Sequence, residues 1–442
     1  MMLNSSMKNL NFYKYGTLTI LSVMLLNMTG CTIPFLDQTP KSVTLNYESL
    51  WENEQTYADV FNNYRNSNPN VTINFQDRSS VDLQAYKKDL LDRLATNRDV
   101  PDIIRIHVSW LPLFQRYLSP APTDLFNKEF VDQNYYPSLS SIIIYKTQDG
   151  SQSYVYGVPL YYDQLNLVYN TSHLSEESVT VPVTWEQFFR NSSALTKKDV
   201  GGKVTRSGAA FGNSGVEFYS DVFGLLLGNA NLGFPNFEQK DLNAIGSVLR
   251  VLNRDTGWNS EFINSGNAFA SRRASMIIAP AWRVNDILVS NPGIELDIAS
   301  VPSSRQDNPQ NWPTFFIEVV PASSPNSAES WKLLKHMSSE ASAQDIYSKQ
   351  SSIRPLPSLP ALKTLADKIE LNPILRKMSQ DALTSRSAYG DNLNHLLSDR
   401  SGNNECIDYV VGILQGVERK EISSFVSDRD SILQACGFAP EN

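Results

Sequence analysis

The sequence is poor in the residues from which most catalytic and metal sites are built. It has only four histidines, at positions 107, 173, 336 and 395, and they form no HExxH motif or other metal-ligand spacing. It also lacks the GxSxG element of serine hydrolases and the GxxxxGK[ST] loop that holds nucleotide phosphates. A glycoside hydrolase would need two carboxylates about 5 to 10 Å apart, and no local motif marks such a pair. We therefore expect no enzyme, no cofactor and no metal, and a chain that does not itself hydrolyse ATP.

Basic residues are also few, with 38 Lys and Arg against 46 Asp and Glu and a formal net charge of -8. This balance argues against nucleic acid and against adhesion to anionic lipid, because both favour clustered Lys and Arg. The composition, 41% hydrophobic and 19% charged, is typical of a globular protein. A length of 442 residues predicts more than one hydrophobic core, so we expect two lobes.

Long apolar runs are absent except near the N-terminus, where residues 16–28 follow Lys8 and Lys14. This run is short of the about 20 residues that span a bilayer, and it ends just before Thr29-Gly30-Cys31. The pattern predicts a bacterial lipoprotein signal over residues 1–30, a lipidated Cys31 and a tether over 31–41; the alternative is an uncleaved anchor. Removing 1–30 takes away two lysines and no acid, which changes the formal charge to -10. We expect the remaining chain to lie outside the cytoplasm, anchored to a bacterial membrane.

Cysteine is scarce too, and lipidation of Cys31 leaves Cys406 and Cys436 in an oxidising compartment. Apolar spacing predicts helices from about residue 406 to 416 and from about 420 to 432. If these helices form an antiparallel hairpin, the two cysteines lie close together. A disulfide there would close a loop of about 30 residues and stabilise the fold by a few kcal/mol. The alternative is two buried free thiols.

Strand and helix patterns alternate after the tether. Apolar alternation predicts strands near residues 43–45, 71–75 and 103–106, and helical spacing predicts helices over 57–64 and 83–94. This order is typical of an α/β lobe with a mainly parallel sheet. Ligands of such lobes bind at the carboxyl ends of the strands.

Aromatic and hydrogen-bonding residues stand at two of those strand ends. Trp51 and Glu52 follow the first strand, and His107 and Trp110 follow the third. A pyranose has an apolar CH face that can stack on an indole and a rim of hydroxyls that polar side chains can bind, so these residues suit a sugar. Each tryptophan could instead belong to the core, and His107 alone is more simply a structural residue.

The segment 154–170, YVYGVPLYYDQLNLVYN, resembles the crossover segment of bacterial extracellular solute-binding proteins of the maltose-binding type, which are receptors of carbohydrate ABC importers. The resemblance continues in the same order along most of the chain. The further matching segments are PVTWEQF at 182–188, ASMIIAPAW at 274–282, AESWKLL at 328–334 and GVE at 416–418. Thr184 and Gln187 in the second segment also form a capping box, and Asn326 and Glu329 suggest a similar helix start.

This resemblance implies an α/β, two-lobed periplasmic-binding-protein-like (type II) fold with a hinge of three crossovers. We expect the crossovers near residues 160–164, 301–305 and 362–371. The first lobe would comprise 42–160 and 305–365, and the second 161–304 and 366–442.

The resemblance also implies binding and hinge closure, with the loaded receptor docking as a monomer on a membrane permease driven by a separate ATPase. Trp282 occupies the place of the stacking aromatic of the second lobe. Trp312 would line the cleft or a hinge, although this chain lacks the glycines that relatives carry before the next strand. Tyr389 is the nearest match to a further aromatic common in the family. The candidate ligand-binding residues are Trp51, Glu52, Trp110, Tyr161, Tyr162, Asp163, Trp282, Trp312 and Tyr389.

Alternative ligands and roles stay open. Aromatics in an acidic cleft also suit a polyamine or a peptide. Adjacent tyrosines such as Tyr161 and Tyr162 hold ferric iron in some related receptors, but an extended crossover would direct them to opposite faces. A surface lipoprotein that captures glycan without a transporter is a further alternative.

Overall fold

The computed structural model describes residues 41–147, 150–212, 216–229, 247–248, 251–252, 254–303 and 310–387. The described residues from Thr44 onward belong to one compact unit. The predicted signal, Cys31, Tyr389, and the hairpin with Cys406 and Cys436 all lie outside the described residues. Within the described ranges, no helix is both long and apolar enough to cross a membrane.

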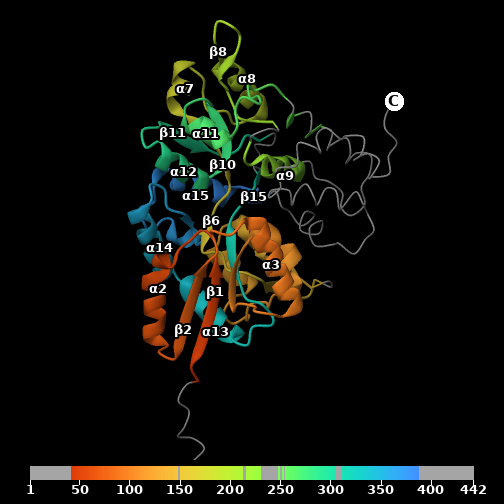
Figure 1. Ribbon diagram of the computed structural model, residues 1–442, viewed down its shortest axis with the longest axis vertical. Coiled ribbons are helices and arrows are strands. Elements are labelled where there is room, and N and C mark those ends of the chain that lie inside the picture. The colour runs from red at the N-terminus through yellow and green to blue at the C-terminus, as the bar shows by residue number, and fades with distance from the viewer. Residues whose placement is uncertain are drawn as a thin grey trace, which may run out of the picture. The chain divides into compact units, whose positions relative to one another are not determined.

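The first sheet has four strands in the order β13-β3-β1-β2. Their bounds are β1 Val43–Ser49, β2 Val71–Asp77, β3 Ile103–His107 and β13 Phe316–Val319, and α2 (Glu54–Ser67) and α3 (Leu83–Thr96) connect the first three (Figure 1). β1 and β3 are parallel, whereas β13 pairs antiparallel with β3. The predicted alternation of strand and helix is confirmed, and the antiparallel strand comes from a segment some 200 residues further along the chain. We call this sheet and its helices the first lobe.

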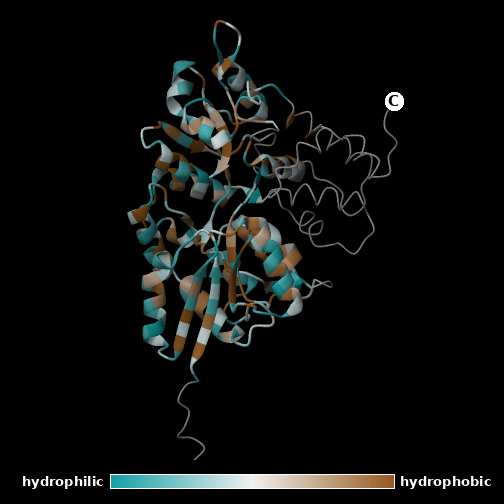
Figure 2. Ribbon diagram, in the orientation of Figure 1, coloured by the Kyte–Doolittle hydropathy of each residue, from teal (hydrophilic) through white to brown (hydrophobic). Residues whose placement is uncertain are grey.

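Helix α2 shows how the sequence specifies an element of this lobe. The Asn53 side chain caps its start by accepting from Thr56 N–H, and the helix ends at Ser67, two residues before Pro69, which cannot continue a helix. Its buried residues, Thr56, Tyr57, Val60, Phe61 and Tyr64, recur at helical spacing. The rings of Tyr57 and Phe61 pack with Tyr47 of β1 and Phe75 of β2 at centroid distances of 5.8 to 6.5 Å. Figure 2 shows the apolar bands on these strands.

Shorter elements complete the first lobe. They are η2 Val108–Trp110, α4 Leu111–Phe114, η3 Gln115–Tyr117, α5 Lys128–Asn134, α6 Pro137–Ile143, and the hairpin of β4 Ile144–Lys146 with β5 Ser153–Val155. α13 (Ser327–Met337) and α14 (Glu340–Ile353) pack against α2. The helix start predicted at Asn326 is present, but the Asn326 side chain makes no cap. Glu329 instead accepts a hydrogen bond from the Tyr64 hydroxyl, which ties α13 to α2.

The second sheet has three strands in the order β10-β7-β11. β7 (Leu165–Asn170) is buried along its whole length and pairs antiparallel with β10 (Met276–Pro280) and β11 (Leu296–Ala299). The other elements are α7 Thr171–Glu176, α8 Trp185–Leu195, α9 Tyr219–Asn229, α11 Ser265–Ala270, α12 Ala281–Ser290, and the hairpin of β8 Lys197–Lys198 with β9 Val204–Arg206. The capping box of Thr184 and Gln187 is confirmed. We call this sheet and its helices the second lobe.

Short pairings join the segments that run between the lobes. β6 (Tyr161–Tyr162) pairs with β14 (Leu359–Pro360), and β12 (Gln310–Asn311) pairs with β15 (Arg386–Ser387). After η4 (Lys363–Leu365), α15 (Pro373–Thr384) packs against β11 of the second lobe and α6 of the first. The pairing of β6 with β14 lies near the first and third predicted crossovers, and β12 begins five residues after the second, while the proposed lobe boundaries themselves stay a prediction.

Candidate ligand-binding site

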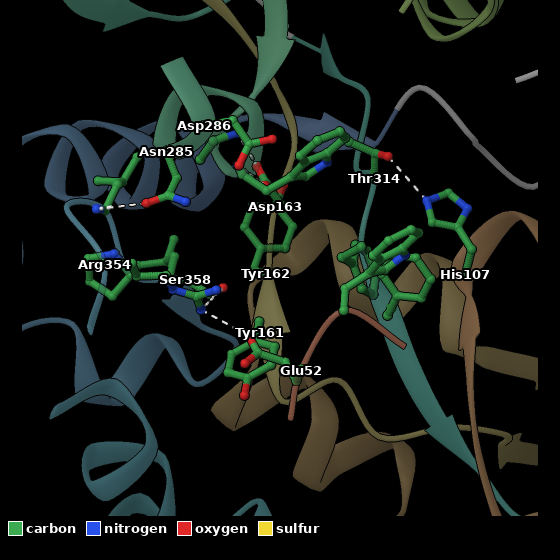
Figure 3. Close-up of a pocket in the computed structure, with 18 of the residues that line it drawn as sticks. Glu52, His107, Tyr161, Tyr162, Asp163, Asn285, Asp286, Thr314, Arg354 and Ser358 are labelled. Atoms are coloured by element: carbon green, nitrogen blue, oxygen red, sulfur yellow. Dashed lines mark hydrogen bonds and ion pairs between the residues drawn. The ribbon is translucent and has the colours of Figure 1, made fainter. Parts of the chain in front are cut away.

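A cavity of about 490 Å³ is lined by residues from both lobes and from the segments that join them (Figure 3). The first lobe and its adjoining loops contribute Trp51, Glu52, Leu83, Arg105, His107, Phe315, Phe316, Arg354, Leu356, Pro357 and Ser358; the second contributes Glu217, Phe218, Asp221, Ala281, Trp282, Asn285 and Asp286. The joining segments add Tyr161, Tyr162, Asp163, Thr314 and Leu359. This volume lies within the range of pockets that bind small molecules.

Two indoles on the cavity wall come from different lobes, and each is 50% exposed. Trp51 follows β1 with a backbone φ of 62°, a left-handed conformation that is uncommon for a bulky residue, and its N–H donates to Ser79 Oγ at 2.6 Å. Trp282 lies in the first turn of α12, edge-on to Phe218 with ring centroids 5.5 Å apart. Because both indoles retain open surface toward the cavity, they can offer apolar faces to a ligand.

Glu52 is held in place by several donors at the start of α2. Its Oε1 accepts from Arg354 Nη2 at 2.9 Å and from Gln350 Nε2 at 2.7 Å, and its Oε2 accepts from Thr56 Oγ1 at 3.0 Å. The same Arg354 nitrogen donates to Ser358 Oγ at 3.0 Å. Glu52 is therefore nearly buried and its charge is paired, so it positions Arg354 on the wall.

Arg105 forms a second paired charge beneath the cavity. Its guanidinium lies 5.1 Å from the centroid of the Tyr161 ring and 5.5 Å from that of Phe316, and its Nη1 donates to the Tyr57 hydroxyl at 2.8 Å. Burial opposes its charge, but Tyr57 and Glu318 outweigh burial and hold the pKa of Arg105 above its usual value. Arg105 is only 4% exposed, so it places a fixed positive charge next to the cavity.

Tyr161 and Tyr162 direct their hydroxyls to different networks. Tyr161 donates to the Tyr57 hydroxyl at 3.1 Å, whereas Tyr162 donates to Gln164 Oε1 at 2.7 Å. Burial raises the pKa of both phenols, which keeps them neutral. In the part of the chain that the structure describes, no group of three or more His, Cys, Asp or Glu residues could hold a metal ion. The two hydroxyls therefore belong to separate buried networks.

Asp163 caps helix α12 from the segment between the lobes. Its Oδ1 accepts from Ala281 N–H at 2.8 Å and from its neighbour Gln164 N–H at 2.8 Å, and its Oδ2 accepts from Trp282 N–H at 3.0 Å. Burial raises the pKa of Asp163 to about 7, against the lowering effect of these three donors. The carboxylate therefore supplies the cap that Pro280 lacks, and it fixes the backbone that carries the Trp282 indole.

Asp221 is a cavity-lining carboxylate that no sequence motif marks. It is 2% exposed, and its Oδ1 accepts from Trp312 Nε1 at 2.7 Å. Burial raises the pKa of Asp221 to about 7.

Four further cavity-lining residues were not predicted from the sequence: Arg105, Arg354, Asp286 and Thr314. Only Arg105 carried a signal, as the one charged residue in the apolar strand IIRIH.

Two tryptophans among the predicted ligand-binding residues are buried and do not line this cavity, although Trp312 does lie on a segment that joins the lobes, as the hinge alternative expected. Trp110 is fully buried, stacks on Phe114 at a centroid distance of 5.9 Å and does not line this cavity, because η2 and α4 fold its ring into the core. Trp312 is 1% exposed and packs so close to Gly224 of α9 that a Cβ there would lie 2.4 Å from the ring. Its place is behind the cavity, where it holds Asp221. His107, given as structural, does line the cavity.

Two α/β lobes, joined by several segments and sharing a lined cavity, define the class of two-lobed ligand-binding proteins. A family model described as bacterial extracellular solute-binding protein matches residues 50–344, more than half of the sequence. The chain therefore belongs to this family. A search of curated proteins finds no match.

Solved structures share this fold at low sequence identity. An ABC transporter solute-binding protein from Thermotoga lettingae, bound with α-D-tagatose, has a TM-score of 0.60 and 18% identity, covering 90% of this chain and 100% of that one. An ABC substrate-binding protein from Listeria monocytogenes in complex with cycloalternan has a TM-score of 0.59 and 14% identity, covering 90% and 100%. UgpB from Mycobacterium tuberculosis, in complex with glycerophosphocholine, has a TM-score of 0.59 and 14% identity, covering 87% and 98%.

Proposed function

We propose that this solute-binding protein takes a sugar or oligosaccharide between its two lobes and delivers it to an ABC permease by hinge closure. The observation that carries the proposal is the pair of half-exposed indoles, Trp51 and Trp282, which reach one cavity from different lobes. A ligand that touches both lobes favours the closed form to the extent that it binds that form better than the open one. The lobes would comprise 42–160 with 305–365 and 161–304 with 366–442.

The cavity wall matches the two faces of a sugar. Each indole can cover an apolar CH face, and removal of that apolar area from water contributes about 25 cal/mol per Å². Asp221, Asp286 and Asn285 present oxygen acceptors for hydroxyl donors. The Thermotoga and Listeria proteins of the same fold are bound to tagatose and cycloalternan, which supports a carbohydrate.

The charges around the cavity favour a neutral sugar over an anionic one. Arg354 is paired with Glu52 at 2.9 Å, and Arg283, behind the wall, is paired with Glu217 at 3.1 Å. Asp163 and Asp221 are held by N–H donors rather than by cations. A uronic acid would bring a further negative charge beside these carboxylates, so it should bind more weakly than the matching neutral sugar.

A cationic solute is the second candidate, and carboxylates on the cavity wall favour it. Asp221 and Asp286 beside the two indoles would suit a polyamine or a peptide amine, since aromatic faces also attract cations. A surface lipoprotein that captures glycan without a transporter would use the same cavity and would differ only in lacking a permease.

A thermal-shift screen of the purified chain tests the ligand class. The panel contains tagatose, mannobiose, maltotetraose, a uronic acid, spermidine and short peptides. A ligand at 100 times its Kd stabilises the fold by about 2.7 kcal/mol, so we expect a rise in Tm with a neutral sugar. A shift with spermidine or peptide alone would overturn the sugar assignment.

Replacing Trp282→Ala should abolish the sugar-induced shift, because it removes one of the two stacking faces while the backbone cap at Asp163 can persist. We expect a loss of affinity of at least tenfold by isothermal titration calorimetry. Val289→Ala is the matched control, since Val289 lies on the same helix, is 60% exposed and does not line the cavity. Equal affinity of the Trp282 variant and the control would contradict the proposed binding surface.

We also propose that the chain is a lipoprotein anchored through Cys31 to the outer face of a bacterial membrane. Acyl chains contribute about 0.8 kcal/mol per buried CH₂, so loss of the lipid should release the protein. We expect Cys31→Ser to move the chain from the membrane fraction to the soluble fraction and to abolish incorporation of labelled fatty acid. Labelling that persists in this variant would contradict the anchor.

A further inference from the structure

Three polar residues, two from the first lobe and one from the joining segment before β13, form a chain of hydrogen bonds beside the cavity. His107 ends β3, Ser109 lies in η2, and Thr314 precedes β13. His107 Nδ1 lies 2.7 Å from Ser109 Oγ and 3.3 Å from Ser109 N, and its Nε2 lies 3.1 Å from Thr314 Oγ1. Figure 3 shows the link between His107 and Thr314. No part of the proposed stacking surface explains this arrangement.

The backbone N–H of Ser109 determines which nitrogen of His107 carries the proton. An N–H group can only donate, so Nδ1 must accept from it, and the Ser109 hydroxyl then donates to the same nitrogen. A neutral imidazole with an unprotonated Nδ1 carries its proton on Nε2. Burial, together with the nearby Lys87, lowers the pKa of His107 to about 3, which agrees with a neutral ring.

The tautomer fixes the role of Thr314 in turn. Because His107 Nε2–H donates to Thr314 Oγ1, that oxygen acts as the acceptor of this bond and its own O–H proton must go to another partner. Among the described residues, His107 is the one side chain that the structure shows bonded to this hydroxyl. Thr314 is 7% exposed and lines the cavity, so a ligand in the cavity can accept the hydrogen bond from its O–H group.

We propose that Thr314 is an oriented hydrogen-bond donor to the bound solute, positioned by Ser109 and His107, and that the solute presents an accepting oxygen at this point. A ring, glycosidic or hydroxyl oxygen of a sugar is the matching group. The proposal rests on the proposed function and deepens it: Asp221 and Asp286 accept from hydroxyls on the second-lobe side, and Thr314 donates on the first-lobe side. The opposed polarity sets the orientation of the sugar in the cleft.

The tautomer can be tested without any ligand. Long-range ¹H–¹⁵N spectra of the ¹⁵N-histidine-labelled full chain, assigned with a His107→Phe variant, should show His107 with an unprotonated Nδ1 and a protonated Nε2 from pH 5 to pH 8. A proton on Nδ1, or protonation of the ring within this pH range, would overturn the proposed direction of the Ser109–His107–Thr314 hydrogen bonds.

Binding measurements test the donor itself. Titration calorimetry with maltotetraose, mannobiose and tagatose compares the wild-type chain with Thr314→Ser, which keeps the hydroxyl, and Thr314→Val, which keeps the shape and removes it. We expect affinity within about threefold for the serine variant and a loss of at least tenfold for the valine variant, about 1.4 kcal/mol. His107→Phe leaves the Thr314 hydroxyl in place but removes the bond that orients it. We therefore expect a loss of sugar affinity between those of the serine and valine variants.

The outcomes separate this proposal from the proposed function. Equal sugar affinity of the valine and serine variants would overturn the donor role while leaving the sugar receptor intact. Absence of binding by the wild-type chain to all three sugars would count against the proposed ligand class. The spectra would then still show whether His107 has the tautomer that makes Thr314 a donor. Circular dichroism of the valine variant checks that it folds.

Discussion

At the scale of single residues, two carboxylates that line the cavity are held by N–H groups and not by cations. Asp221 accepts a hydrogen bond from the indole N–H of Trp312, and Asp163 accepts hydrogen bonds from the backbone N–H groups of Ala281 and Trp282. Burial raises the pKa of each to about 7, so protonation competes with the charged form near neutral pH. A sugar hydroxyl that donates to Asp221 would favour its charged form.

The stability of the fold should depend on pH through Asp221. Its pKa is about 7 in the folded chain and about 4 when unfolded, so the folded state binds more protons between these values. The contribution of protonated Asp221 to the free energy of unfolding is therefore fully present below pH 4 and is lost as pH rises through 7. Asp221→Asn keeps an oxygen for Trp312 and does not ionise, so its stability relative to wild type should rise between pH 4 and pH 8, by up to about 4 kcal/mol.

Urea unfolding of the ligand-free chain at pH 4, 6 and 8 measures this difference. Asp124→Asn, at an exposed position, makes the same change in net charge and serves as the control. A pH-independent difference between the Asp221 variant and wild type would show that the carboxylate is not buried as described.

The sequence could predict which residue types meet the ligand, but not which tryptophan faces the cavity. Trp51 and Trp110 both follow strands of the first sheet, yet the first is half-exposed and the second is fully buried. Exposure depends on side chains far away in the sequence or on local backbone geometry, such as the left-handed φ of Trp51. Asp221 could not be predicted because its partner, Trp312, is 91 residues away.

At the scale of elements, the turn between β1 and α2 carries local strain at the binding surface. Trp51 has a φ of 62°, a region that costs an L-residue about 1 to 2 kcal/mol and glycine very little. The following Asn53 already caps α2, so the chain must turn sharply between the strand and the helix. The strained turn presents the indole to the cavity.

A pair of substitutions separates the strain from the loss of the indole. Trp51→Ala and Trp51→Gly both remove the ring, so both should lose sugar affinity. Only glycine adopts this φ freely, so the glycine variant should be more stable than the alanine variant by about 1 kcal/mol. Thermal unfolding of both variants measures the difference. An alanine variant as stable as the glycine variant would contradict the left-handed turn.

Elements with local signals were predictable and distant pairings were not. The caps at Thr184 and Asn53 and the break at Pro69 lie next to the helices that they delimit, so apolar spacing and capping together define those helices. The pairing of β13 with β3 joins Phe316 to His107 and has no local signature. Thr314 precedes β13 and its N–H donates to Asp163 O, so its place at the cavity depends on long-range pairings that no local pattern marks.

At the scale of the whole molecule, a buried polar network lies where the segments between the lobes meet. The Tyr162 hydroxyl accepts from Ser138 Oγ at 3.0 Å and from Asn311 Nδ2 at 3.1 Å, and Asn311 also donates to Ser385 Oγ at 2.6 Å. Such bonds fix the geometry of the joining segments because each buried polar group needs its partner. Family resemblance predicted the two lobes, while the residues that hold their connection came only from the structure.

Binding of a sugar between Trp51 and Trp282 is tested most directly by a crystal structure of the complex. The sugar with the largest thermal shift should lie in the cavity with one face against each indole and with an oxygen within hydrogen-bonding distance of Thr314 Oγ1. A sugar that contacts one lobe only, or that occupies instead the groove between β11 and α15 lined by Ala299 and Lys377, would contradict the account.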